Sequence, residues 1–510
     1  MLADRPDDLL FSSRMRTIRC GLLALAVFGL AARPGLGDDD LRAQARAALE
    51  KATAYMRSIS TEGGYLWKYS LDLKERAGET KATATQIWIQ PPGTPSVGMT
   101  FLRAYEATKD VRYLDAARDA AEALARGQVE SGGWDYLIDF DPAKSRLSYL
   151  RSDKGKLSAE QAAKRKNLTN FDDNTTQSAL RFLLAFVDAA KGSSDPRDAR
   201  ILEALDYGLK KMIEAQYPNG AWPQRWLGQS RKPEDHPVVK ARYPESYPRE
   251  FPKVNYYAHY TLNDNAQQDC IETMLDAYRR TGKAECLAAA KKGGDFFILA
   301  QMPEPQPAWA QQYNARMEPA WARAFEPPAI TGNESVGAMQ CLMDLYLETG
   351  DERFMKPLPA AVAWFKRSAI APDKWARYYE LKTNKQLFGD RDGKIYYRFE
   401  DISEERQKHY SWSGEYHVTK TIEFYERLKK EGRDAILKER QARAAASKVK
   451  RSRSRPAGVK EIVAALDSQG RWVTTGHVKH RNWEFNDRVE TEVFIKNVRR
   501  LCDYLEATGR

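Results

Sequence analysis

Along the middle of the chain, hydrophobic residues recur among polar ones with the spacing of a helix. Four segments share one layout of helix, polar turn, second helix and a turn containing Trp, at 101–136, 183–224, 274–309 and 342–375. In the second segment apolar residues recur every four positions, at Ile201, Leu205, Leu209 and Ile213. The strict alternation of a half-buried strand is scarce, so the pattern predicts repeated helix pairs.

The four Trp residues occupy corresponding places in these segments, at Trp134, Trp222, Trp309 and Trp375. Helix pairs that repeat bury their apolar faces by stacking on one another. Long inserts at 137–170 and 225–258 separate some of the helices. They favour an α/α toroid, in which helix ends and loops build a cleft, over an open α-solenoid. We expect a mainly α fold, an α/α toroid-like barrel of repeated helix pairs with long loops and a few short β-strands.

The N-terminus resembles a secretory signal peptide. An apolar run at 20–32 follows Arg14, Arg16 and Arg19 and precedes three consecutive Asp residues. A run of this length is shorter than the roughly 20 residues of a membrane-spanning helix. We expect residues 1–37 to be a signal peptide, with Met15 as an alternative start, and the protein to be secreted or periplasmic and free of the membrane after cleavage. An N-terminal membrane anchor is the alternative.

Composition and charge change this picture in one respect. Hydrophobic residues make up 42% of the 510 residues, which excludes a wholly disordered chain. The formal net charge is +11, but the segment 428–460 alone carries twelve Lys or Arg and three Asp or Glu. We interpret 428–460 as a basic linker and expect no nucleic-acid partner, since no binding module is recognisable. The toroid then spans 38–427, and 461–510 is a C-terminal helical segment that docks on it through an apolar stripe.

Two clusters of Asp and Asn stand at the starts of predicted helices in successive repeats. The first contains Asp172 and Asp173, and the second contains Asp264. Clusters at equivalent positions of a toroid converge at its centre, and carboxylate oxygens are ligands that suit Ca²⁺. The alternative is that these residues only cap their helices.

Two further stretches are candidates for chemistry. Arg323 and Glu334 belong to a loop made rigid by two prolines, just before a helix. The alternative is that Arg323 pairs with Glu326 to hold the loop. Trp222 follows a Pro-Asn-Gly turn, an arrangement typical of sugar stacking and equally of packing between repeats.

An ordered set of motifs gives these residues a context: FDDNTTQSALRFL, AQYPNGAWPQRW, AHYTLNDNA, ARAFEPPAITGNESVG and LFGDRDGKIYYRFEDISEER. The set spans about 43–412 and resembles the pectate lyases of polysaccharide lyase family 10. The resemblance implies an exported, toroid-like enzyme that cleaves polygalacturonate by β-elimination with help from Ca²⁺. The DDNTT and GDRDG stretches depart from the commoner family patterns, which affects the expected subsites more than the reaction.

Carried over residue by residue, the resemblance assigns each candidate a role. Arg323 corresponds to the catalytic base. The metal ligands are Asp172, Asp173 and Asp264. The substrate-binding residues are Arg391, Trp222, His259 and Glu334.

The expected function is therefore that of a monomeric, calcium-assisted pectate lyase that acts on polygalacturonate and releases 4,5-unsaturated oligogalacturonides. One alternative is an inverting glycoside hydrolase on an acidic polysaccharide, with Asp172 and Glu334 as its two carboxyl groups. The other is a non-catalytic homologue that binds polyuronate. Hydrolysis and elimination differ in that only elimination leaves a double bond that absorbs ultraviolet light.

Overall fold

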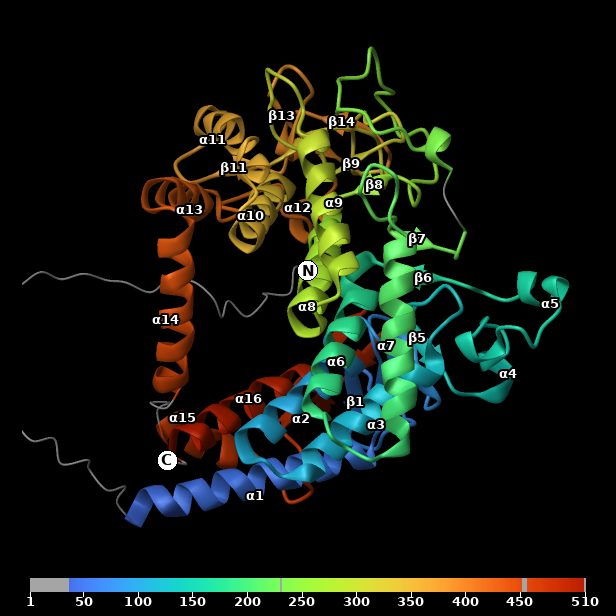
Figure 1. Ribbon diagram of the computed structural model, residues 1–510, viewed down its shortest axis with the longest axis vertical. Coiled ribbons are helices and arrows are strands. Elements are labelled where there is room, and N and C mark those ends of the chain that lie inside the picture. Colours follow the sequence, from blue (N-terminus) through green and yellow to red (C-terminus); the bar gives the residue numbers. More distant parts are fainter. Residues whose placement is uncertain (1–35, 230–231, 452–455, 509–510) are drawn as a thin grey trace, which may run out of the picture.

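A computed structural model describes residues 36–229, 232–451 and 456–508. Helices dominate these ranges, and the strands are two to four residues long (Figure 1). The predicted signal peptide lies outside the described residues except for its last two, which begin helix α1 (Leu36–Ser58), so export stays a prediction. No helix in the described ranges combines the length and apolar character that crossing a membrane requires.

Twelve of the helices in the described ranges form six pairs. The inner helices are α2 (Thr94–Thr108), α6 (Thr175–Ala189), α8 (Ala266–Thr281), α10 (Gly332–Thr349), α13 (Val418–Glu431) and α16 (Thr491–Thr508). The outer helices are α1, α3 (Val111–Gly127), α7 (Pro196–Glu214), α9 (Ala284–Ala300), α11 (Leu358–Arg367) and α15 (Pro456–Ala464). Asp110 and Asp195 cap α3 and α7 by accepting backbone N–H bonds, which fixes where these outer helices begin.

The inner helices contact one another in the order α16, α2, α6, α8, α10, α13, which confirms the predicted toroid-like arrangement. Helix α14 (Arg433–Arg451) contacts α10, α13 and α16 and spans the distance between the last two units (Figure 1). The segment 428–460, predicted as a basic linker, therefore contains a helix that takes part in the ring. Residues 452–455 of that segment lie outside the described ranges.

The repeated Trp residues join each outer helix to the next inner helix. The indole N–H groups of Trp134, Trp222, Trp309 and Trp375 donate to main-chain carbonyls of the preceding outer helix at 2.8–2.9 Å. The backbone N–H of Trp222 donates to Gln267 of α8 at 2.7 Å, and Trp134 and Trp309 make the equivalent bonds. Trp472 repeats the indole contact after α15, so the pattern extends one unit beyond the four that the sequence indicated.

Short antiparallel strands precede the inner helices and hold the loops at that end of the ring. The two-stranded pairs are β4 (Gln86–Trp88) with β5 (Leu137–Asp139), β6 (Thr169–Asn170) with β7 (Arg225–Trp226), β8 (Tyr260–Thr261) with β9 (Gln312–Tyr313), and β11 (Trp375–Ala376) with β15 (Ser413–Gly414). A four-stranded sheet has the order β10 (Ile330–Thr331), β12 (Tyr378–Tyr379), β13 (Gln386–Gly389) and β14 (Ile395–Tyr396).

The C-terminal segment contains strands as well as the predicted helix. A five-stranded sheet has the order β16 (Val473–Thr474), β19 (Arg488–Glu490), β1 (Lys68–Ser70), β2 (Arg76–Ala77) and β3 (Lys81–Ala82). Strands β17 (Val478–His480) and β18 (Trp483–Phe485) form a separate hairpin. The apolar stripe Phe494, Val498, Leu501 and Leu505 is buried in α16, which packs on α1 and α2. The two ends of the described chain are thus built into one part of the ring.

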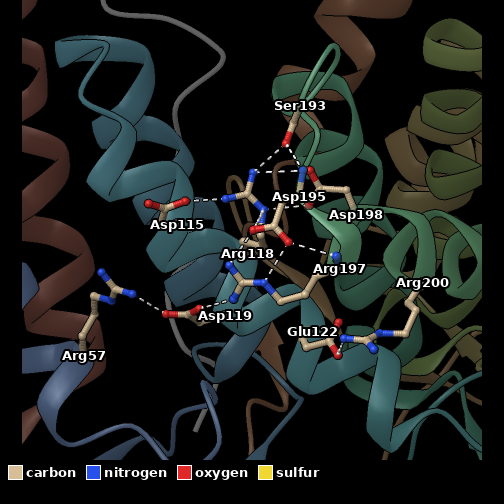
Figure 2. Close-up of polar contacts among 10 residues, drawn as sticks. All are labelled: Arg57, Asp115, Arg118, Asp119, Glu122, Ser193, Asp195, Arg197, Asp198 and Arg200. Carbon is tan, nitrogen blue, oxygen red and sulfur yellow. Dashed lines mark hydrogen bonds and ion pairs between the residues drawn. The ribbon is translucent and has the colours of Figure 1, made fainter.

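A network of ion pairs ties the outer helices α1, α3 and α7 together (Figure 2). At its centre the Arg118 side chain, only 4% exposed, donates to Asp198 at 2.7 Å and also contacts Asp115 and Asp195. Asp119 extends the network by accepting from Arg57 and Arg197. A buried cation with several carboxylate partners keeps neighbouring repeats in register, because loss of the contacts would leave its charge unpaired.

Candidate active site

Two turns of the same unusual conformation bring the acidic clusters together. In the turn Asp172–Asn174, before α6, Asp173 and Asn174 have φ of 50° and 56°. In the turn Asn263–Asn265, before α8, Asp264 and Asn265 have φ of 50° and 56°. Left-handed backbone is disfavoured for most L-residues and tolerated by Asp and Asn, which explains these residue types. Because α6 and α8 are neighbours, the two turns contact each other.

A third turn shows which part of this arrangement belongs to the fold. Tyr416 and His417, just before α13, also have positive φ, of 44° and 57°. The same turn conformation therefore repeats before three inner helices. Its first residue with positive φ is Asp in the turns before α6 and α8 and Tyr in the turn before α13. The helix-capping alternative is wrong for the two N-cap residues, since neither the Asn174 nor the Asn265 side chain accepts a hydrogen bond from a backbone N–H of its helix; Asn174 Oδ1 instead accepts from the Arg181 side chain at 2.8 Å.

Asp172, Asp173 and Asp264 form one cluster, with a carboxylate oxygen of each within 4.8 Å of the other two. The Tyr136 hydroxyl lies 3.0 Å from Asp173 Oδ2 and 3.3 Å from Asp172 Oδ2. Asn263 Nδ2 donates to Asp264. Asp172 Oδ1 is buried and has no hydrogen-bond partner among the described residues. Three carboxylates that lie close together, one of them with a buried oxygen that has no partner, form a set of ligands suited to binding a cation.

The crowding of these carboxylates changes their protonation. Desolvation by burial, and then the charge of Asp173, raise the pKa of Asp172 to about 6. Desolvation and the charge of Asp264 raise the pKa of Asp173 to about 6. Desolvation and the charge of Asp172 raise the pKa of Asp264 to about 7. Three hard oxygen donors that repel one another fit Ca²⁺, whose charge would relieve the repulsion.

Arg323 lies beside the cluster, and its positive charge lowers the pKa of all three aspartates. Its backbone N–H and its Nε donate to Glu326 Oε2 at 3.1 and 2.7 Å, and a terminal nitrogen donates to Oε1. Glu326 is 2% exposed, so the ion pair that the sequence offered as an alternative is present and buried on the Glu326 side. Burial lowers the pKa of Arg323, but the bonds to Glu326 outweigh burial and raise it.

Arg391 reaches the same place from the turn between β13 and β14. Three guanidinium groups lie near the ring of Phe325. Their distances to the ring centroid are 4.9 Å for Arg323, 5.3 Å for Arg391 and 4.4 Å for Arg406. The Arg391 side chain is 61% exposed and pairs with Glu405 at 3.0 Å. Two arginines beside three carboxylates provide cationic groups for an anionic ligand, and the exposed Arg391 is free to exchange its partner.

The structure corrects one predicted substrate contact and describes two others. Trp222 is 0% exposed, and its indole donates to the Met212 carbonyl at 2.8 Å, so it packs between repeats and has no surface for stacking on a sugar. Glu334 is also buried, with Oε1 3.5 Å from an Arg377 nitrogen. Its Oε2 has no hydrogen-bond partner among the described residues, and its contact with substrate stays a prediction. His259 is half-buried, its Nδ1 has no partner among the described residues, and burial lowers its pKa.

Sequence reasoning missed two residues of the site. Arg377 lies 3.5 Å from Asn263 Oδ1 and 4.4 Å from the centroid of the Tyr410 ring, and its charge lowers the pKa of Asp264. Arg377 and Tyr136 each stand two residues after a repeated Trp, Trp375 and Trp134. The residue two positions after the repeated Trp is the signal that could have identified both.

Comparison with known proteins identifies the family of the chain. The family model described as pectic acid lyase matches residues 139–374 and 367–421. No curated protein matches the chain.

Three solved structures resemble the chain distantly. A family 10 polysaccharide lyase from Cellvibrio cellulosa is 22% identical, covering 66% of this chain and 97% of its own, with a TM-score of 0.44. A mutant of that lyase in complex with trigalacturonic acid is 21% identical, covering 66% and 98%, with a TM-score of 0.44. Cellobiose 2-epimerase from Bacillus thermoamylovorans is 14% identical, covering 92% and 99%, with a TM-score of 0.40. Because the family model alone accounts for more than half of the 510 residues, the chain belongs to the pectic acid lyase family and is a polysaccharide lyase.

Proposed function

We propose that the protein is a pectate lyase that cleaves α-1,4-linked polygalacturonate by calcium-assisted β-elimination and releases 4,5-unsaturated oligogalacturonides. The observation that carries this proposal is the cluster of three carboxylates with the positive charge of Arg323 beside it. The N-terminal pattern of basic, apolar and small residues supports export, as a secreted or periplasmic enzyme.

β-Elimination removes the proton at C5 of a uronate, forms a double bond between C4 and C5, and expels the sugar oxygen attached to C4. Asp172, Asp173 and Asp264 would hold the calcium ion. When bound, the ion neutralises the substrate carboxylate and so makes the adjacent C5 proton more acidic. Arg391, exposed and paired only at the surface, binds a uronate carboxylate through its planar guanidinium.

Arg323 is the proposed base, by resemblance to the family. A guanidinium is normally protonated, and the bonds to Glu326 strengthen that preference here. Arg323 therefore accepts the C5 proton only after it has lost one of its own. Alkaline pH and the arrival of further positive charge in the cleft both favour that loss. The same residue, while protonated, attracts the anionic substrate.

The test is ultraviolet absorbance during incubation with polygalacturonate, with calcium and then with a chelator. We expect absorbance to rise with calcium and to stop rising with chelator. New reducing ends without absorbance would indicate the hydrolase alternative. Binding without any product would indicate the non-catalytic homologue.

A further inference from the structure

A cavity of about 650 Å³ lies next to the acidic cluster and is not used by the reaction described above. The ring of Tyr136 lines it, while the hydroxyl of the same residue bonds to Asp172 and Asp173. Trp88 stacks behind Tyr136 with ring centroids 6.4 Å apart. Tyr136 therefore connects the cavity to the acidic cluster, and the volume of the cavity lies within the usual range for ligand sites.

The walls of the cavity come from parts of the chain that are far apart in sequence. One wall is the insert that carries helix α4 (Pro142–Ser145). Another part of the lining is Glu79, which is paired at 2.5 Å with Arg481 at the turn of the β17–β18 hairpin. Trp483 in that hairpin donates to the Glu79 carbonyl at 3.2 Å. Glu79 and Arg481 lie outside residues 139–421, which the family model matches.

The charges that line the cavity are mostly paired. Arg126 pairs with Glu62 at 2.8 Å, Lys166 with Asp135 at 2.5 Å, and Arg481 with Glu79. Lys144 in α4 is different, since it has no acidic partner among the residues that the structure describes. The carboxylate of Asp139 also lines the cavity, where it accepts hydrogen bonds from Thr85 and Gln86. Lys144 is thus the cation of the described lining that is available to pair with the carboxylate of a ligand.

Apolar side chains that are open to solvent face the same space. Leu147 is 62% exposed and Leu137 is 36% exposed, and Phe140 also lines the cavity. Exposed apolar side chains grouped beside an unpaired cation match the surface of a uronate, which has C–H groups on its ring faces and a carboxylate at one edge.

We propose that this cavity is a distal saccharide subsite, which takes a uronate unit of the same polysaccharide beyond the cleavage point. The carboxylate of that unit binds Lys144, and its ring packs on Leu147 and Phe140. This inference rests on the proposed function for the identity of the polysaccharide. It predicts that long oligosaccharides bind more tightly than short ones because only the long ones reach the cavity.

The test compares Lys144→Gln and Leu147→Glu with the parent protein on tri- and hexagalacturonate. Affinities are measured by titration calorimetry with calcium in an Arg323→Ala background, so that turnover does not consume the ligand, and initial rates are measured with Arg323 in place. Lys144→Gln should weaken hexamer binding by about 3- to 10-fold, as for loss of one partly exposed charge contact, and leave the trimer unchanged. Leu147→Glu should weaken the hexamer further by charge repulsion. Lys164→Gln is the control, because Lys164 belongs to the same insert, pairs with Glu160 at 2.6 Å and does not line the cavity.

Equal binding of the hexamer by the parent and both cavity variants would overturn the subsite, and so would an equal loss for trimer and hexamer. If the protein with Arg323 releases no unsaturated product but Lys144→Gln still loses affinity only for the hexamer, the subsite stands and the proposed reaction fails. If unsaturated product forms normally and hexamer binding does not depend on Lys144, the reaction stands and the subsite fails.

Discussion

Removing one charge from the acidic cluster should stabilise the calcium-free protein, in contrast to most changes at a buried polar site. The change is Asp173→Asn, which keeps the shape of the side chain and an oxygen that can accept from Tyr136. Asp173 has a carboxylate oxygen within 4.8 Å of oxygens of both Asp172 and Asp264. At that separation each pair of charges repels by about 1 kcal/mol at the dielectric constant of water and about 3 kcal/mol at an effective value of 20.

The raised pKa of Asp173 determines the pH range in which the substitution increases the free energy of unfolding. The pKa of Asp173 is raised from 3.8 to about 6, so the folded state holds its proton more tightly than the unfolded chain does. The resulting stabilisation is complete below pH 4 and is lost as the pH rises through 6. Because the group is partly exposed, we expect Asp173→Asn to raise the free energy of unfolding by about 1 to 2 kcal/mol at pH 8, and by almost nothing at pH 4.

Urea denaturation in the presence of a chelator measures this difference, with Asp235→Asn as the control because Asp235 is exposed and has no side-chain partner among the described residues. Added calcium should reverse the order, since the parent then gains binding energy that the variant has partly lost. The reasoning would be refuted if Asp173→Asn lowered stability at pH 8 without calcium, or if its effect were the same at both pH values.

Three further predictions concern the site and the ring. Glu326→Gln should move the pH–rate profile on polygalacturonate toward lower pH, because the bonds that Arg323 donates to the Glu326 carboxylate raise the pKa of Arg323; an unchanged profile would contradict this. Arg323→Ala should lower turnover by about 10²- to 10⁴-fold and also lower the temperature of thermal unfolding, because it leaves the buried Glu326 carboxylate unpaired; Arg323→Lys should regain part of that stability without restoring activity, and near-normal turnover of the Ala variant would exclude Arg323 as the base. Trp222→Ala should reduce the free energy of unfolding by about 3 to 5 kcal/mol, as for a buried aromatic residue, whereas weaker substrate binding at unchanged stability would mean that the residue does face the cleft.

The helical parts of the fold could be predicted from local pattern. Apolar residues at helical spacing and the recurrent Trp were enough to predict paired helices and a toroid, because the period of a helix is a property of neighbouring residues. The positions of Asp172, Asp173 and Asp264 at the starts of inner helices were likewise visible, since a repeat places equivalent residues at equivalent points of the ring.

Only the tertiary structure decided which side of each element faces the cleft. Trp222 follows a polar turn that resembles a sugar-binding surface, yet its indole turns toward the Met212 carbonyl. Arg377 lies between the short strands β11 and β12, where the sequence has no helical period, and its neighbours Asn263 and Tyr410 are distant in sequence. The cavity wall at Glu79 and Arg481 joins segments some four hundred residues apart. Such contacts depend on how the two ends of the chain meet in the ring, and no local pattern of residues carries that information.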